Sequence, residues 1–387
     1  MGRTMEQRAR RIVRLGMIVA ALCVAGAASA QESTANAAAS APPAQVPWPD
    51  PASNAAESMP LATQALLLDF VESGKRAIAV GENGMVLLSD DRTAWRQAAQ
   101  VPTRATLTAV AAVGDRVWAV GRDGVIVASV DGGENWTLQR KDPWQPPGAD
   151  SAGSDARHGA PLLDVLFTDE THGVAIGAYS LYLETADGGA TWTPRQILAA
   201  DAPAGAAADA PADGENKQNW TFSKEELKIG DEDEPHFNAI ARTSDGSLLI
   251  AAERGSIMRS RDAGKTWQRG KLPYDGSMFG ALGFDGQRAM VFGLRGHAFE
   301  TDDLGDTWRE IATDTELSLL GGAKLANGGA ALVGANGLVL LRRAANEPFR
   351  AGTVQPAGAL AAVLPIEGGA AFAVAGENGI ARFQPRQ

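Results

Sequence analysis

The chain has almost no cysteine: Cys23 is the single one among 387 residues. It lies inside an amino-terminal leader, so a mature chain without that leader has no disulfide and no thiol chemistry. Histidine is also scarce, and the four residues show no ligand spacing with each other or with the cysteine; they are His158, His172, His236 and His297. The sequence therefore predicts no metal site, and nothing in it indicates a cofactor.

Long apolar runs are missing too. After the leader, no stretch approaches the roughly 20 apolar residues that a membrane helix needs. The leader itself has an apolar run over residues 15–28 and small residues at 28–30, after five arginines: Arg3, Arg8, Arg10, Arg11 and Arg14. This is the three-part pattern of a secretory signal (residues 1–30), with cleavage near Ala30; an uncleaved anchor is the alternative. Leu22 stands where a lipoprotein signal has a small residue, so we expect a protein of the periplasm or medium without a lipid anchor.

Positive charge is in short supply. The full chain has 35 basic and 46 acidic residues, and the leader holds five arginines and one glutamate. The mature chain then has 30 basic and 45 acidic residues, a formal charge of −15. Nucleic-acid binding needs a basic footprint, so this balance argues against such a partner and favours a soluble monomer.

A repeated unit organises the rest of the chain. Each copy has an apolar run ending in Gly-x-x-Gly, a second apolar run, a polar turn and an aromatic residue. The first position of this motif falls at Gly81, Gly121, Gly177, Ala252, Gly293, Gly334 and Gly376. Successive copies are 40, 56, 75, 41, 41 and 42 residues apart. A base unit of about 41 residues is typical of a four-stranded propeller blade.

Each unit also supplies an apolar run upstream and a polar run downstream of this core. Strands buried on both faces should be almost continuously apolar, and an outermost strand should be polar. The sequence thus predicts an all-β fold, a seven-bladed β-propeller of four-stranded antiparallel blades over residues 61–387. The two longer spacings predict insertions at about residues 139–160 and 194–235.

The seventh unit stops after its third strand, which would leave an open sheet edge. Residues 31–60 are rich in alanine, serine and proline and predict a flexible linker. Within them, residues 45–48 place Trp48 where the fourth strand of other units begins with tryptophan. We therefore expect this amino-terminal segment to donate the closing strand.

The turn between the third and fourth strands follows Ser/Thr-x-Asp-x-Gly-x-Thr/Asn-Trp, which resembles the Asp box of BNR-type propellers. Its aspartates are Asp91, Asp131, Asp187, Asp262 and Asp303, and its tryptophans are Trp95, Trp136, Trp192, Trp267 and Trp308. The carboxylate can accept hydrogen bonds from its own turn, and the indole can pack between blades. The alternative, that these aspartates are catalytic acids or metal ligands, is not favoured, because a repeated element serves the scaffold.

Blade topology places the Gly-x-x-Gly turns and both insertions on one face and the Asp turns on the other. Most residues inside the Gly-x-x-Gly turns suit tight turns, but Arg122, Arg254 and Arg295 do not have that explanation. Arginines grouped on one rim can hold a carboxylate-bearing partner. We predict these three as partner-binding residues and no catalytic residue; ordinary solvated arginines are the alternative.

Seven units of the form AVGxxGxIxxSxDGGxTW behind a signal peptide resemble the photosystem II stability/assembly factor family of propellers. The resemblance implies a non-catalytic assembly, stability or accessory factor that docks on a membrane protein or envelope complex through an arginine-bearing face. In other bacteria it implies a periplasmic accessory protein, with resistance-nodulation-division transporters among the candidate partners.

A second class of function stays open. Sialidase-like glycosidases also carry Asp boxes, and their chemistry resembles an arginine triad with a tyrosine nucleophile. This chain has three tyrosines, Tyr179, Tyr182 and Tyr274, and no Arg-Ile-Pro motif near the first unit. Binding of a glycan or a small hydrophobic ligand in the central channel is a further alternative.

Overall fold

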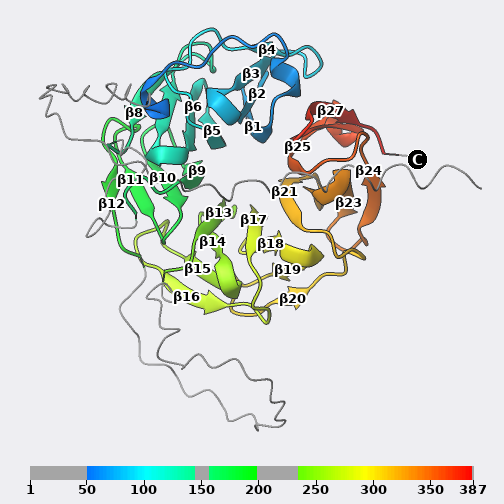
Figure 1. Ribbon diagram of the computed structural model, residues 1–387. Coiled ribbons are helices and arrows are strands. Elements are labelled where there is room, and N and C mark those ends of the chain that lie inside the picture. Colours follow the sequence, from blue (N-terminus) through cyan, green and yellow to red (C-terminus); the bar gives the residue numbers. More distant parts are fainter. Residues whose placement is uncertain (1–49, 144–156, 198–233, 386–387) are drawn as a thin grey trace, which may run out of the picture. The chain divides into compact units, whose positions relative to one another are not determined.

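The computed structural model describes residues 50–143, 157–197 and 234–385. In these ranges the chain forms seven antiparallel sheets, arranged as blades around a common axis (Figure 1). Within each sheet the strands follow chain order, and the first strand of each blade lies against the first strand of the next. The predicted all-β, seven-bladed propeller with four-stranded antiparallel blades is confirmed.

The strands have the following bounds. Blade one consists of β1 (Leu67–Ser73), β2 (Arg76–Gly81), β3 (Val86–Ser89) and β4 (Arg96–Gln97). Blade two consists of β5 (Leu107–Val113), β6 (Arg116–Gly121), β7 (Ile126–Ser129) and β8 (Thr137–Arg140). Blade three consists of β9 (Leu162–Phe167), β10 (Gly173–Gly177), β11 (Tyr182–Thr185) and β12 (Thr193–Pro194). Blade four consists of β13 (Phe237–Arg242), β14 (Leu248–Ala252), β15 (Ser256–Ser260) and β16 (Gln268–Lys271).

Blade five consists of β17 (Met278–Gly283), β18 (Ala289–Gly293), β19 (Ala298–Thr301) and β20 (Arg309–Glu310). Blade six consists of β21 (Leu319–Lys324), β22 (Gly328–Gly334), β23 (Leu338–Ala344) and β24 (Arg350–Thr353), and blade seven of β25 (Leu360–Ile366), β26 (Ala371–Gly376) and β27 (Gly379–Phe383). The described residues also form short 3₁₀ helices: η1 (Pro51–Ser53), η2 (Ala62–Gln64), η3 (Glu82–Gly84), η4 (Arg122–Gly124), η5 (Glu253–Gly255), η6 (Leu294–Gly296), η7 (Ala335–Gly337) and η8 (Glu367–Gly369).

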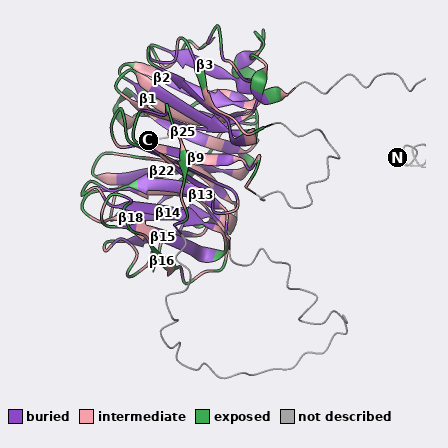
Figure 2. Cartoon of the chain, turned by 90° about the vertical axis from the view of Figure 1, so that its left-hand side faces the viewer, coloured by how far each residue is buried: buried purple, intermediate pink, exposed green. Residues whose placement is uncertain are grey.

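Burial explains why the strands differ in composition. The second strands are the most buried: every residue of β14, β18 and β26 is buried. The fourth strands are short and exposed, as in β12 and β20. Buried residues therefore follow the strands, and exposed residues gather in the turns at both faces (Figure 2).

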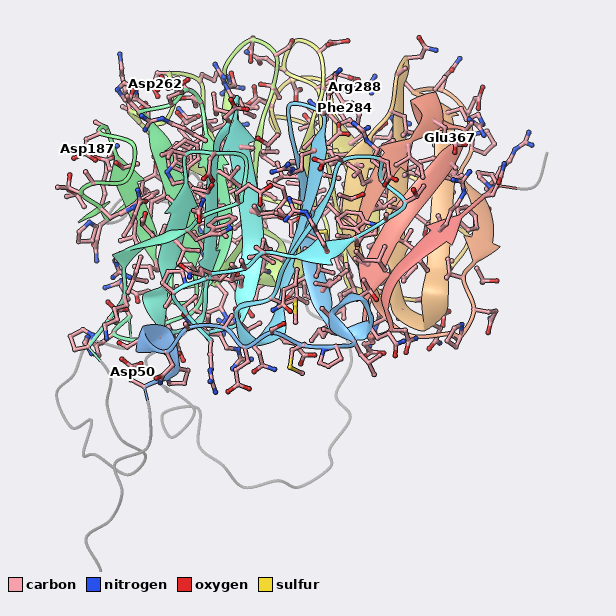
Figure 3. The ribbon with its side chains drawn as sticks, turned by 90° about the horizontal axis from the view of Figure 1, so that it is seen from above. Asp50, Asp187, Asp262, Phe284, Arg288 and Glu367 are labelled. Atoms are coloured by element: carbon pink, nitrogen blue, oxygen red, sulfur yellow. The ribbon has the colours of Figure 1, made fainter. Side chains whose placement is uncertain are left out.

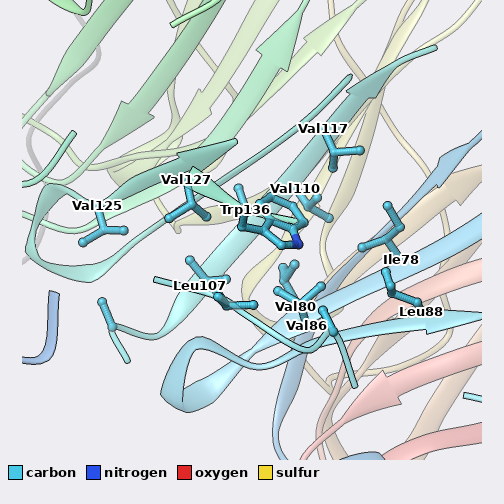
Figure 4. Close-up of a cluster of buried hydrophobic side chains, with 14 of the residues drawn as sticks. Ile78, Val80, Val86, Leu88, Leu107, Val110, Val117, Val125, Val127 and Trp136 are labelled. Carbon is cyan, nitrogen blue, oxygen red and sulfur yellow. The ribbon is translucent and has the colours of Figure 1, made fainter. Parts of the chain in front are cut away.

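The blades are joined by apolar clusters that span neighbouring sheets. Trp136, at the start of the fourth strand of blade two, packs against Ile78 and Leu88 of blade one (Figure 4). Its indole N–H donates a hydrogen bond of 2.8 Å to the carbonyl oxygen of Gly133, which holds the ring in this place. The same position is Phe349 in blade six, where the ring packs with the cluster of blade five. One aromatic residue thus packs its blade against the preceding one.

Blade seven has three strands among the described residues, whereas each other blade has four. The segment expected to supply the fourth strand, residues 45–48 with Trp48, lies outside the described residues, so closure by that segment stays a prediction. The ring closes through side chains: Leu364 and Ile366 of blade seven pack with Phe70 and Trp95 of blade one.

The chain packs on the propeller from Asp50 onward, which shortens the linker predicted to run to residue 60. The Asp50 carboxylate caps η1 and lies 2.7 Å from the Lys141 ammonium at the end of blade two. Ala52 is fully buried, and farther along the carbonyl of Thr63 lies against Gly379 at the start of β27. Residues 50–64 therefore cross from blade two to blade seven on one face of the ring.

A buried ion pair links blades five and six. The guanidinium of Arg342 in β23 donates to the carboxylate of Glu300 in β19, and the two side chains are 1% and 4% exposed. Arg309 reaches the other Glu300 oxygen at 3.0 Å, and the Arg342 guanidinium lies 5.2 Å from the ring centre of Phe349. Removing one partner of such a pair leaves an uncompensated buried charge.

We predict that Glu300→Ala lowers the free energy of unfolding by about 3–5 kcal/mol, because Arg342 keeps its charge without its partner. Urea unfolding of the mature chain measures this, with Glu170→Ala as the matched control, since Glu170 pairs with Arg116 at 61% exposure. The double variant Glu300→Met/Arg342→Met should lose less than Glu300→Ala. Equal losses in Glu300→Ala and Glu170→Ala would contradict a structural role for the pair.

Candidate partner-binding face

The propeller has two unlike faces. The 3₁₀ helices η3 to η7 join second and third strands on one side, which we call the turn face. The turns around Asp131 and its equivalents, which join third and fourth strands, form the opposite face. Figure 3 shows Asp187 and Asp262 on that opposite face, far from Asp50 on the turn face. At the insertions, the backbone N–H of Asp142 donates to the carbonyl of Asp123, and the carbonyl of Pro235 accepts the N–H of Ser180. Asp123 and Ser180 both belong to the turn face.

The aspartates of the opposite face bond within their own turns. Asp187 accepts the backbone N–H of Thr191 at 2.9 Å and its hydroxyl at 2.6 Å. These hydrogen bonds lower the pKa of Asp187 to about 2, and the bond from the Thr191 hydroxyl has the largest effect. The pKa of Asp303 is also lowered to about 2, chiefly by the backbone N–H of Thr307. The pKa values of Asp91, Asp131 and Asp262 are lowered as well. Carboxylates engaged in this way act on their own turn rather than on a ligand.

On the turn face of blades one to six, two successive residues between the second and third strands adopt left-handed conformations. In blade one these are Asn83 (φ 54°) and Gly84 (φ 67°), residue types that tolerate this region well. Arg254 and Arg295 occupy the position of Asn83 in blades four and five, each with φ 55°. Arginine tolerates this region less well than asparagine or glycine does, and both side chains are exposed. At these two positions a charged side chain therefore stands where the backbone conformation favours a smaller residue.

Two of the three predicted arginines, Arg254 and Arg295, lie at equivalent positions in adjacent blades of the turn face. Arg122 lies on the same face, but one residue earlier in its turn and in blade two, so blade three separates it from Arg254. All three are exposed. The predicted group is therefore an arc over blades two to five and not a single cluster.

Blade three breaks the turn pattern inside this arc. Its left-handed residues are Tyr179 (φ 55°) and Ser180 (φ 54°), with no glycine. A backbone held in such a region costs roughly 1–3 kcal/mol per residue and persists where the surroundings enforce it. Here the Ser180 N–H and hydroxyl both donate to the carbonyl of Pro235, at 3.1 and 2.9 Å. The Arg157 guanidinium donates to the carbonyl of Tyr179 at 3.1 Å.

Two aromatic pairs flank the blade-four turn that carries Arg254. Tyr179 meets the ring of His236 edge-on, with 4.9 Å between ring centres, and His236 lies 3.6 Å from the Glu253 carboxylate. On the other side, Tyr274 stacks on His297 with 3.9 Å between ring centres. His297 Nδ1 lies 2.6 Å from Glu310. Each pair is only partly buried, so the arc offers ring faces and polar groups beside its arginines.

Sequence reasoning missed these pairs. Tyr179 and His236 are separated by the second insertion, and a search for metal-ligand spacing does not detect histidines that contact tyrosine rings. The feature of the sequence that could have indicated this contact is the absence of glycine from the left-handed positions of the blade-three turn. Tyr182, the third tyrosine, is 2% exposed, and burial raises its pKa to about 12, so it is not available as a surface nucleophile.

The central channel is a second concave site, with a volume of about 380 Å³. Its wall is the ring of innermost strands, and polar side chains of this wall form hydrogen bonds to the neighbouring blade. Asp69 accepts the N–H of Val110 at 2.9 Å, and Asp164 accepts that of Ile240 at 2.8 Å. Glycines replace such side chains in blades five and six, where Gly280 and Gly321 line the wall. The channel is thus polar on one side and apolar on the other.

Both channel carboxyls are crowded by the innermost strands although they keep some access to water. Burial raises the pKa of Asp69 to about 7, and the charge of Asp164 adds to this. Burial also raises the pKa of Asp164 to about 7. Among the described residues, no three histidine, cysteine or acidic side chains are grouped as metal ligands, and no helix has the length and apolar character to cross a bilayer.

Similarity to known proteins agrees with this architecture. The sequence profile of the family described as Photosynthesis system II assembly factor YCF48 matches residues 155–224. The Photosystem II assembly lipoprotein Ycf48 of Synechococcus sp. (strain CC9902) is 30% identical over 157 residues, which is 39% of this chain and 37% of that protein. The chain therefore matches little more than a third of that relative's length.

Solved structures extend the likeness to the whole ring. Ycf48 bound to a D1 peptide superimposes with a TM-score of 0.60 at 14% identity, covering 86% of this chain and 97% of that chain. Ycf48 from Cyanidioschyzon merolae superimposes with a TM-score of 0.57 at 16% identity, covering 85% and 98%. At these identities the structures show the fold. Together with the sequence matches, they show a seven-bladed propeller that is similar to Ycf48 proteins.

The raised pKa values of the channel carboxyls predict a pH-dependent stability. The folded protein holds these protons at pH values where the unfolded chain, with an aspartate pKa near 4, has released them. Their contribution is therefore complete below about pH 4 and is lost as the pH rises through about 7. Urea unfolding between pH 4.5 and 8 should show this decline, with a shallower slope in Asp164→Asn. An equal slope in both proteins would contradict the assignment.

Proposed function

We propose that this protein is a non-catalytic, exported assembly, stability or accessory factor that docks on a membrane protein or envelope complex. The partner-binding surface is the arc of the turn face that carries Arg122, Arg254 and Arg295. Support comes from the likeness to Ycf48 proteins, which are named as photosystem II assembly proteins, one of them solved with a D1 peptide. The location we propose is the periplasm, after cleavage of the signal near Ala30.

The observation that carries the proposal is the backbone conformation of the two central arginines. Arg254 and Arg295 have φ 55° where blades one and six have asparagine, Asn83 and Asn336. Asparagine tolerates this region better than arginine does, so the turn itself does not call for a guanidinium. A planar, permanently charged group that can bind a carboxylate through two hydrogen bonds is the property that arginine adds here.

The neighbouring side chains suggest how the contact is built. The stacked Tyr274–His297 pair and the Tyr179–His236 pair lie on either side of the Arg254 turn. Aromatic residues and arginine are the types that dominate the energetics of protein interfaces. We therefore expect a partner segment that presents carboxylates to the arginines and apolar groups to the exposed ring surfaces. Large envelope transporters, including the resistance-nodulation-division class, are candidate partners.

The test uses the mature chain (residues 31–387) as bait for detergent-solubilised membranes of the source cells. The triple variant Arg122→Ala/Arg254→Asn/Arg295→Asn removes the guanidinium groups and installs residues that the chain already uses at these turn positions, Ala335 and Asn336. The control is Arg116→Ala, because Arg116 lies at the turn joining β5 and β6 on the opposite face and is 41% exposed.

We expect the mature chain to enrich a membrane protein, and the triple variant to lose most of that enrichment, since truncating one partner of a charge pair buried in a complex costs roughly 2–5 kcal/mol. Arg116→Ala should behave as the unchanged protein does. Thermal unfolding checks that the triple variant remains folded. If the triple variant retained the same partners as the unchanged chain, the arc would not be the docking surface.

A non-catalytic role also predicts the outcome of a substrate screen. Tyr182 is buried, Tyr179 meets the edge-on ring of His236, and Tyr274 stacks on His297, so no tyrosine is placed as an accessible nucleophile beside an arginine triad. We expect no release of fluorophore from a panel of fluorogenic glycosides, sialosides included, at micromolar protein. Turnover that disappears on mutation of a channel or turn-face residue would instead favour the glycosidase alternative.

A further inference from the structure

Blade seven presents an open sheet edge. Its third strand, β27, pairs with β26 from Gly376↔Gly379 to Phe372↔Phe383, and no described strand lies on its other side. In blade six the corresponding strand β23 pairs with β24 along Leu338↔Thr353 to Leu341↔Arg350. Among the described residues, the backbone N–H and C=O groups along the outer side of β27 therefore have no partner strand, and they can pair with a further strand.

A groove of about 1090 Å³ lies between β24 of blade six and β27 of blade seven. Its apolar surface includes Val354 and the ring of Phe383, which packs beside Gly352. A groove beside an unpaired edge has the two elements that strand addition uses: main-chain hydrogen bonds for affinity, and pockets that receive alternate side chains.

The charge of the groove is opposite to that of the chain. Arg343, Arg350 and Arg382 line it and are exposed, against one acidic lining residue, Glu347. The whole chain has a formal charge of −11. Arg382 forms a surface ion pair of 2.7 Å with Glu367, a contact that contributes little and can be exchanged for another carboxylate.

We propose that the edge of β27 binds an extended, acidic segment of a partner protein, which adds as the fourth strand of blade seven. Successive side chains of an added strand face opposite sides of the sheet. Its carboxylates lie on the side of Arg382, and its alternate apolar side chains face Phe383 and Val354 in the groove, whose rim carries Arg350. This surface lies on the rim of the ring and is separate from the arginine arc. The two sites can therefore be tested independently.

The chain's own residues and a second copy fit the edge less well. Asp50 is bound to Lys141 on blade two, and the described chain that follows touches blade seven at Thr63 and then enters β1. Residues 31–49 contain four prolines, which have no N–H to donate, and Glu32 is their one acid. Pairing of two β27 edges would bring the arginines of both copies together, which is repulsive.

The experiment measures binding of a fluorescein-labelled six-residue peptide of alternating glutamate and valine, by fluorescence anisotropy at low ionic strength. The protein is the mature chain (residues 31–387). The same peptide with N-methyl groups on alternate residues removes main-chain donors, and a lysine–valine peptide reverses the charge. Arg350→Glu/Arg382→Glu is compared with Arg116→Glu, whose arginine is also in a surface pair with glutamate and is 41% exposed against 43% for Arg382.

We expect the glutamate peptide to bind and the N-methylated and lysine peptides not to bind. The double arginine variant should weaken binding by at least about tenfold, and Arg116→Glu should leave it unchanged. Hydrogen exchange should slow at residues 379–383 when the glutamate peptide is bound, a readout that does not depend on any variant.

Three results would overturn the proposal. Absence of binding to the unchanged chain is the first. Binding that emerges only in a chain lacking residues 31–49 is the second, because that segment would then be the occupant. Concentration-dependent dimers that dissociate in Arg350→Glu/Arg382→Glu are the third, since a second copy would then cover the edge.

Discussion

The propeller depends on one interaction, in which an aromatic ring before the fourth strand of a blade, in blades one to six, packs against the preceding blade. A single blade has two broad faces to bury, and it can do so only against its neighbours. Trp136 covers Ile78 and Leu88 of the preceding blade, and Trp95 closes the circle against Leu364 and Ile366 of blade seven. The Asp turns hold these rings at the start of the fourth strand. The repeated aspartates and tryptophans, which could be taken for catalytic residues in the sequence, therefore stabilise the scaffold.

The fold could be predicted because its determinants are local and repeated. Most units carry their own turn glycines and an aromatic residue before the fourth strand, and the period of the motif counts the blades. In blade one the first glycine of the motif is needed for space, because a Cβ at Gly81 would meet the carbonyl of Leu66; blade four has Ala252 at this position. The completion of blade seven could not be derived in the same way, because it requires a pairing partner that no repeat specifies.

The candidate site was predictable in part, for a related reason. Arg254 and Arg295 could be assigned to one face, since topology alone decides which turns share a side. The Tyr179–His236 contact joins residues on either side of an insertion and depends on the Pro235 carbonyl bonding to Ser180. No periodicity encodes such a contact. The channel carboxyls were missed because Asp69 and Asp164 look like single polar interruptions of apolar strands.

The left-handed arginines have an evolutionary consequence. A selection that rewards only resistance to heat would be free to replace Arg254 and Arg295 by asparagine or glycine, since either relaxes the backbone at φ 55°. A selection that rewards survival of the cell would have to keep them if their charge is used. In each of these two turns, a single position thus separates the demands of folding from the demands of function.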